Sequence, residues 1–223
     1  MASEYLMKKY KDVKPEEPKV LTPQEKRANW LHYHRIHFII GAVLLLVGVG
    51  VVKDVFMKTE PDYQIGYFSD LYLSDTLEAE IEERLSALGE DLNGDGKVVV
   101  QLNPYVIVPE DPLSYTVQIS MVGDMSVGLS DYYLVADPVF FQEEYGILTM
   151  TDGSIFDVGM DPNLCVRYPV KDCAVFDGLE FEEDLYLTRR QFVKEEDLKA
   201  HAGAAGLWDT MTAGAAMVST EKE

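Results

Sequence analysis

The segment that decides the fold runs from residue 63 to residue 108. It opens with YQIGYF (63–68) and closes with VVVQLNPYVIV (98–108), two stretches rich in β-branched and aromatic residues that predict strands. Between them a helix is expected, with Asp75 as its N-cap and Gly89 at its end, because apolar residues recur there at helical spacing: Leu77, Ile81, Leu85 and Leu88. Strand, helix and strand in this order predict a right-handed βαβ unit with parallel strands.

The next clear strand covers residues 132–136, and the segment Ser114–Leu129 before it is ambiguous. An alternation of Tyr115, Val117, Ile119 and Met121 favours a strand, whereas the stripe Tyr115, Ile119, Val122 and Met125 favours a helix. We expect the helix, because it would carry the chain to a third parallel strand.

Further along, Asp137 and Pro138 resemble an N-cap and a first helical position, and Gly146 would end that helix. The sequence then predicts a hairpin over 147–158, a strand over 185–189 and a helix over 195–211. The fold class expected is α/β, with one layered domain, a mainly parallel sheet and a C-terminal hairpin and helix addition.

A run of fifteen apolar residues, FIIGAVLLLVGVGVV (38–52), precedes this domain. With its flanks it forms a 22-residue segment, 36–57, which is long enough to cross a bilayer as a helix. Eight Lys and Arg lie in residues 1–35, and only Lys53 and Lys58 closely follow the apolar run 38–52, which predicts a cytoplasmic N-terminus. No A-x-A site follows the run, so an uncleaved anchor is favoured over a signal peptide.

The sequence therefore predicts five regions in a single-pass protein of the plasma membrane. These are a basic cytoplasmic tail (1–35), a transmembrane helix (36–57), a linker (58–62), an extracellular α/β domain (63–212) and a flexible tail (213–223). Residues 59–223 carry 33 acidic and 9 basic side chains, and the whole chain has a net charge of −20. This charge argues against nucleic acid as a partner. The lipid bilayer is the first partner expected.

Histidines cluster just before the span, in NWLHYHRIHF (29–38). His32, His34 and His37 suggest a metal site, but one helix cannot direct three imidazoles at one ion. We expect instead that Trp30 and Tyr33 mark the level of the lipid headgroups.

The motif DLNGDGK (91–97) resembles the first half of a calcium loop. Asp91, Asn93 and Asp95 supply oxygens at positions 1, 3 and 5, and Lys97 could add its carbonyl at position 7. Positions 9 and 12 are Val99 and Leu102, so any Ca²⁺ would need ligands from elsewhere. The alternative is a glycine-rich turn between helix and strand.

Cys165 and Cys173 are the only cysteines, and an extracellular location would permit a disulfide between them. Two buried free thiols are the alternative. The domain holds one histidine, His201, and no G-x-S-x-G motif, so we expect no enzyme and no cofactor other than possible Ca²⁺.

Three stretches carry a resemblance that covers residues 28–145: WLHYHRIHFIIG (30–41), DLNGDGKVVVQ (91–101) and GLSDYYLVADPVFF (128–141). Together they resemble uncharacterised single-pass membrane proteins of Gram-positive bacteria. The phrase GLSDYYLVADP is also similar to one lobe of an extracytoplasmic solute-binding protein. That likeness implies a ligand cleft near Asp131 and Asp137.

Two functions are consistent with these patterns. The first is a membrane-anchored binding or accessory domain, working with a transporter or envelope protein on a small solute. Its site would lie at strand ends near Asp70, Asp131 and Asp137. The second is a structural or signalling module that senses a cation or the state of the envelope and contains a calcium-stabilised loop.

Overall fold

The computed structural model describes residues 22–56 and 60–218 of the 223-residue chain. The chain divides into two units, one ending at Lys58 and the other beginning at Thr59, and each is described here by itself. Because the first unit's description starts at Thr22, most of the predicted basic tail lies outside the described residues.

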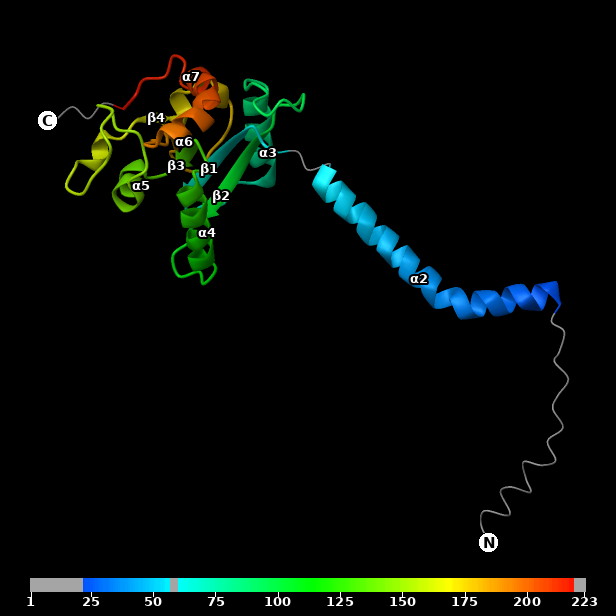
Figure 1. Ribbon diagram of the computed structural model, residues 1–223. Helices are drawn as coiled ribbons and strands as arrows, with labels where there is room; N and C mark the ends of the chain where they lie inside the picture. The colour runs from blue at the N-terminus through cyan, green and yellow to red at the C-terminus, as the bar shows by residue number, and fades with distance from the viewer. Residues whose placement is uncertain (1–21, 57–59, 219–223) are drawn as a thin grey trace, which may run out of the picture. The chain divides into compact units, whose positions relative to one another are not determined.

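The first unit contains one long helix, α2 (Pro23–Phe56), which bends partway along its length (Figure 1). It begins 13 residues before the span expected from the sequence, because TPQE (22–25) forms a capping box. The Glu25 amide donates to Thr22 Oγ1 over 3.3 Å, and the Thr22 amide donates to Glu25 Oε2 over 2.8 Å. Pro23 occupies the first helical position, where no amide hydrogen is needed.

Within the described residues, α2 is the one helix long and apolar enough to cross a membrane, and its candidate stretch is Pro23–Gly50. None of that stretch is buried, and Leu44, Leu45 and Leu46 are each at least 65% exposed. The helix therefore presents to its surroundings the side chains that a folded domain would bury.

The second unit is built on a five-stranded sheet in the order β2-β1-β3-β5-β4. Strands β1, β2 and β3 are parallel, as expected, whereas β5 is antiparallel to both β3 and β4, so the sheet is mixed rather than mainly parallel. Helices link the parallel strands, whereas the chain enters β5 at the same end of the sheet at which it leaves β3, because Tyr186 pairs with Val135. The strands are β1 (Tyr63–Ser69), β2 (Val100–Val106), β3 (Tyr132–Val135), β4 (Arg167–Pro169) and β5 (Tyr186–Arg189).

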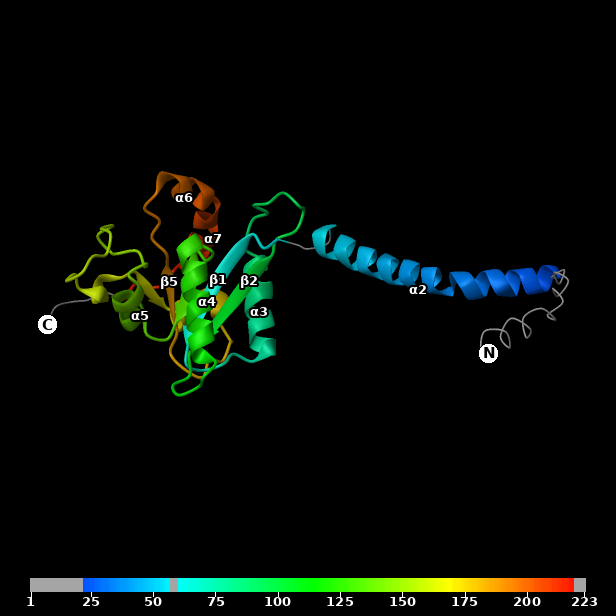
Figure 2. The same cartoon turned by 60° about the horizontal axis from the view of Figure 1, so that its bottom comes forward.

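Two hydrophobic clusters cover the two faces of this sheet. The α3 face is packed by α3 (Asp75–Ser86) together with the C-terminal helix α7 (Ala205–Met211), and the α4 face by α4 (Ser114–Val127) and α5 (Pro138–Tyr145). Figure 2 shows α4 crossing in front of the strands. Alternate strand residues divide between the faces: Tyr132 joins the first cluster and Tyr133 the second.

Helix α3 forms where the sequence predicts it, but Ser74 rather than Asp75 is its N-cap. The Leu77 amide donates to Ser74 Oγ over 3.2 Å. Ile81 and Leu85 are fully buried, whereas Leu88 is 42% exposed because the helix ends before it.

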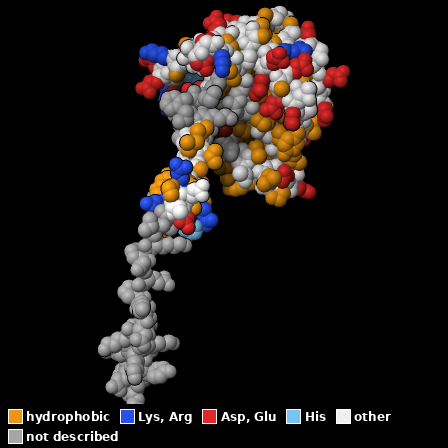
Figure 3. Space-filling view, turned by 90° about the vertical axis from the view of Figure 1, so that its right-hand side faces the viewer, with side chains coloured by type: hydrophobic (Ala, Val, Ile, Leu, Met, Phe, Trp, Pro, Cys, Tyr) orange, Lys and Arg blue, Asp and Glu red, His pale blue; other side chains and the backbone are white. Residues whose placement is uncertain are grey.

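Helix α4 confirms the helical interpretation of residues 114–129, but it buries a different face from the expected stripe. Met121 and Met125 are buried, whereas Tyr115, Ile119 and Val122 are 70%, 56% and 49% exposed. Figure 3 shows an apolar area on the lower side of the domain, while Asp and Glu side chains are scattered above it.

The second half of the domain departs most from expectation. The predicted hairpin over 147–158 does not form; Leu148 pairs instead with Arg190, and Met150 with Cys165. The predicted helix over 195–211 is broken into α6 (Glu195–Ala200), a 3₁₀ turn at 202–204 and α7. Close packing accompanies the break, since a Cβ at Gly203 would lie 2.8 Å from the Leu92 side chain.

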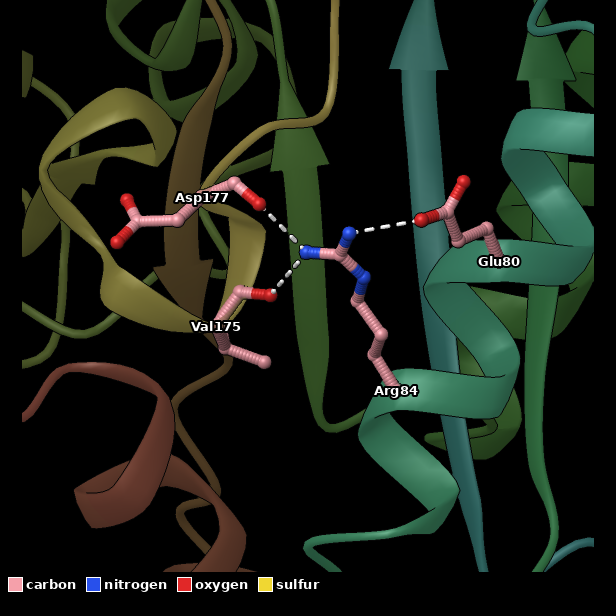
Figure 4. A network of polar contacts seen from close by, with 4 residues as sticks. All are labelled: Glu80, Arg84, Val175 and Asp177. Atoms are coloured by element: carbon pink, nitrogen blue, oxygen red, sulfur yellow. Dashed lines mark hydrogen bonds and ion pairs between the residues drawn. The ribbon is translucent and has the colours of Figure 1, made fainter.

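Arg84 of α3 fixes the loop that follows the 3₁₀ turn at 174–176 (Figure 4). Its guanidinium donates to the Val175 and Asp177 carbonyls over 3.2 and 2.7 Å, and it pairs with Glu80 over 2.7 Å. A loop 91 residues distant in sequence is thereby held against the α3 side of the sheet.

The outer edge of β2 is closed by side chains of α3. The Val100 amide donates to Ser86 Oγ over 3.0 Å and the Leu102 amide to Glu82 Oε1 over 2.8 Å. The next outward position is Pro104, which has no amide hydrogen. This edge therefore offers few free donors to another strand.

Candidate functional site

The carboxyl ends of β1 and β3 mark the place where an open α/β sheet ordinarily binds ligands. The order β2-β1-β3 reverses direction at β1, so the two crossover helices diverge onto opposite faces beside this point. Asp70 follows β1 and is exposed, and Asp137 follows β3. These two predicted site residues lie at the same edge of the sheet, because Phe68 pairs with Val135 in the register.

Asp137 has a structural role at this edge, as a helix cap. As predicted, it is the N-cap of α5, and its Oδ1 accepts the amides of Val139 and Phe140 over 3.1 and 2.9 Å. Pro138 occupies the first turn, and Gly146 ends the helix with a positive φ of 63°. The carboxylate that the sequence places at the cleft is thus directed at a helix terminus.

A carboxylate that the sequence analysis missed, Glu183, lies beside β1 at this edge. Its Oε1 accepts a short hydrogen bond from the buried Ser69 hydroxyl and lies 3.3 Å from the Tyr67 hydroxyl, which donates to the Leu71 carbonyl over 2.9 Å. Burial raises the pKa of Tyr67 to about 12, and the negative charge of Glu183 acts in the same direction. Tyr67 is therefore a neutral hydrogen-bonding group at physiological pH.

A small hollow of about 90 Å³ opens next to this cluster. Its walls combine apolar and aromatic side chains with glutamates from the run EFEED (180–184), and no Lys or Arg lines it. The lining includes Tyr67, Tyr72, Leu77, Glu180, Phe181 and Glu183. The acidic run was the available sequence signal, but nothing in it indicates a contact with β1, which is 114 residues away.

Asp131 lies at the opposite edge of the sheet, before β3, so the structure does not bring it together with Asp70 and Asp137. It meets His201 instead: Nδ1 and Oδ1 are 2.7 Å apart in an ion pair whose side chains are 25% and 10% exposed. The contact lacks the alignment of a hydrogen bond. Burial raises the pKa of the Asp131 carboxyl, and the proximity of His201 opposes that rise.

The Asp131–His201 pair is enclosed by stacked side chains. The His201 ring lies parallel to the Phe192 ring with centroids 4.1 Å apart, and the Arg190 guanidinium lies 5.4 Å from the centre of Phe192. Three buried polar atoms nearby have no hydrogen-bond partner within the described part of the chain: Ser130 Oγ, Arg190 Nε and Gln191 Oε1. A cavity of about 60 Å³ lies beside the pair and is lined by Asp131, Phe192 and His201 among others, but by none of the residues that hold those three atoms.

The loop 91–97 is exposed, and its side-chain oxygens accept backbone amides. Asp91 accepts from Gly94 and Gly96 over 2.7 and 2.8 Å, Asn93 from Asp95 and Asp95 from Lys97, each over 2.9 Å. Asp62 anchors the loop by accepting from Leu92 over 2.8 Å. This is the geometry of a turn whose Asp and Asn residues stabilise the backbone.

In residues 22–56 and 60–218, no group of three or more His, Cys, Asp or Glu side chains is arranged to hold a metal ion. Ca²⁺ at Asp91, Asn93 and Asp95 stays a prediction. The histidines of α2 form no such group either. His34 already contacts Trp30: its Nδ1 lies 2.8 Å from the Trp30 carbonyl oxygen, and the two rings stack with centroids 4.5 Å apart.

The disulfide expected between Cys165 and Cys173 is not formed, and both thiols are free and buried. The sheet separates them, because Cys165 belongs to the cluster on the α4 face and Cys173 to the cluster on the α3 face. Burial raises the pKa of both thiols, that of Cys173 to about 11. The alternative of two buried thiols is the one that the structure adopts.

Comparisons of the chain with protein families, with curated proteins and with solved structures found no match. The resemblance to Gram-positive single-pass proteins stays a prediction.

Proposed function

We propose that this chain is a membrane-anchored, non-catalytic binding or accessory protein with its acidic α/β domain outside the cell. The observation that carries the proposal is α2, a 34-residue helix whose large apolar side chains are exposed from Trp30 to Val49. Burying those side chains in lipid removes a large apolar surface from water.

The distribution of charge supports an orientation. Residues 1–35 carry eight basic side chains, and the domain that follows the helix is strongly acidic. Basic flanks are retained in the cytoplasm during insertion, so the N-terminus would be inside and the domain outside.

Two measurements on the full chain test this arrangement. We expect it to float with phosphatidylcholine vesicles and to resist extraction by alkaline carbonate. We also expect protease added to intact cells to remove a C-terminal epitope tag and to leave an N-terminal tag. A chain released by carbonate would contradict the anchor, and a protected C-terminal tag would contradict the orientation.

The binding role is assigned to the carboxyl edge of β1 and β3, near Asp70, Asp137 and Glu183. The strand order and the hollow beside Tyr67 support that position. Because the hollow has the volume of about three water molecules, it suits a small solute or one group of a larger one. A transporter or envelope protein would be the partner that uses the captured solute.

A panel of small solutes, added to the detergent-solubilised full chain, tests the binding role through the melting temperature. A solute at 100 times its Kd should stabilise the domain by about 2.7 kcal/mol. We expect Asp70→Ala or Glu183→Gln to weaken binding, and Asp131→Asn, at the opposite edge, to leave the affinity unchanged. Equal effects at both edges would contradict the assignment.

The second candidate is a cation-sensing module centred on the loop 91–97. It is favoured by the exposure of Asp91, Asn93 and Asp95 on a backbone that their own side chains already hold in a turn. If Ca²⁺ binds there, EDTA should lower the melting temperature, and Asp95→Asn should abolish the response. An unchanged melting temperature would remove this candidate.

A further inference from the structure

Helix α2 carries a groove along one face, at the junction between its basic and apolar sections. The lining includes Leu31, His32, Arg35, Phe38, Ile39 and Ala42, all of them exposed. They recur every three or four residues and therefore follow one side of the helix.

The chemistry of the lining changes along the groove. Ala28 and Leu31 lie at its N-terminal end, His32 and Arg35 follow with nitrogen donors one turn apart, and no acidic side chain lines the groove. Phe38, Ile39 and Ala42 continue the same face into the apolar run. The groove thus carries the Arg35 charge directly before an apolar stretch, which is the complement of an anionic amphiphile.

The expected level of Arg35 in the bilayer is consistent with a contact to an anionic lipid headgroup. It directly precedes the segment 36–57 expected to cross the bilayer. Its long side chain can therefore keep the guanidinium at the level of the lipid phosphates, while the methylene groups lie along the helix.

His34 and Lys26 do not share the position of Arg35. His34 is engaged with Trp30 by its ring stack and by the contact of Nδ1 with the Trp30 carbonyl. Lys26, nine residues before Arg35, lies about two and a half turns away and so on the opposite face. Arg27, eight residues before Arg35 and about 80° around the helix from it, does not line the groove. His32 and Arg35 are the nitrogen-bearing side chains of the lining.

We propose that this groove binds an anionic phospholipid, with its phosphate at Arg35 and His32 and an acyl chain along Phe38, Ile39 and Ala42. The inference rests on the proposed function, since it requires α2 to lie in a bilayer. Charge complementarity selects the occupant: a neutral amphiphile would leave Arg35 without a counter-charge.

Native mass spectrometry of the full chain in detergent, titrated with phosphatidylglycerol or phosphatidylcholine, tests the proposal. We expect the first phosphatidylglycerol to bind more tightly than phosphatidylcholine. Arg35→Gln should weaken that first binding about fivefold, the effect of one basic residue at a membrane surface, and should leave phosphatidylcholine unaffected.

A charge-relocation variant separates the groove from general attraction to a basic surface. Arg35→Gln combined with His37→Arg keeps a guanidinium near the same depth but moves it by about 160° around the helix. Binding of phosphatidylglycerol should stay weak in this double variant. Recovery to the wild-type level would overturn the proposal.

Flotation with vesicles of pure phosphatidylcholine tests the membrane anchor separately from the phospholipid-binding groove. If the wild-type chain does not float, the proposed membrane anchor fails and the groove proposal falls with it. If it floats but shows no preference for phosphatidylglycerol, only the groove proposal is overturned. Equal flotation of all variants, with the preference lost in both Arg35 variants, is the expected result.

Discussion

His201 and Asp131 join the C-terminal helical segment to the sheet through a pair whose carboxyl is buried. A carboxyl with a raised folded-state pKa favours folding when protonated, and that contribution is lost as the pH rises through the folded-state pKa. The proximity of His201 opposes the rise in the Asp131 pKa and so reduces this loss.

We predict that His201→Gln destabilises the domain by ~1–3 kcal/mol at pH 6 and by less at pH 4. Burial raises the pKa of the Asp131 carboxyl, this carboxyl is more ionised at the higher pH, and the variant lacks the neighbouring imidazole that opposes the rise. Urea unfolding across this pH range measures the difference. In a variant that also carries Asp131→Asn, the pH dependence of the effect should disappear. A gap that is constant with pH would show that His201 acts through packing alone.

Asp137 offers a prediction about helix capping. Asp137→Ala should lower stability by ~1 kcal/mol, because the amides of Val139 and Phe140 lose their acceptor, whereas Asp137→Asn should retain most of it. Melting temperatures of the two variants check this. Equal losses in both would contradict the capping role.

Residues whose role is local could be predicted from the sequence, and residues paired over long separations could not. The cap at Asp137 follows from its position before Pro138. The contact of Glu183 with Ser69 joins residues 114 apart, and Asp131 meets His201 only because the C-terminal segment returns to the start of β3. Neither pairing leaves a periodic signal.

At the scale of the element, α4 shows how an ambiguous pattern is decided by packing. Val117, Met121 and Met125 face the sheet, and this set combines residues from the strand-like alternation and from the helical stripe. Topology was the better guide to the element, because a crossover to a parallel strand needs a helix. The buried face could not be chosen from apolar residues that surround the helix on most sides.

A pair of substitutions tests which face of α4 is buried. Met121→Ala should cost ~2–5 kcal/mol, because it leaves a cavity in the cluster on the α4 face, and Ile119→Ser should change stability by less than ~0.5 kcal/mol. Chemical denaturation gives both values. The reverse order would place the stripe predicted from the sequence in the core.

The β2 edge leads to a prediction about association. Glu82→Ala leaves the Leu102 amide without its acceptor, so we expect a loss of ~1–2 kcal/mol and increased self-association through the edge. Glu83→Ala, one residue along and exposed, is the matched control. Sedimentation velocity and melting temperature check the pair, and indistinguishable variants would refute the edge-closing role of Glu82.

For the molecule as a whole, the sequence predicted the βαβ unit, the third parallel strand and the apolar helix. The prediction of a mainly parallel sheet failed in the stretch between Ile147 and Tyr186, where the chain lacks regular periodicity. The direction of β5, which follows this stretch, depends on its pairing with β3 and β4 rather than on local propensity. The mixed sheet follows from that stretch. The hairpin predicted over 147–158 failed for the same reason.

The two free cysteines have a consequence for how the domain unfolds. Each thiol reports on one layer, Cys165 on the α4 face and Cys173 on the α3 face, and neither reacts while its layer stays closed. In variants that retain one cysteine each, a thiol reagent should label both at the same rate if the sheet opens cooperatively, and at different rates if one layer detaches first. The domain thus carries two built-in probes of its own opening, one buried thiol on each side of the sheet.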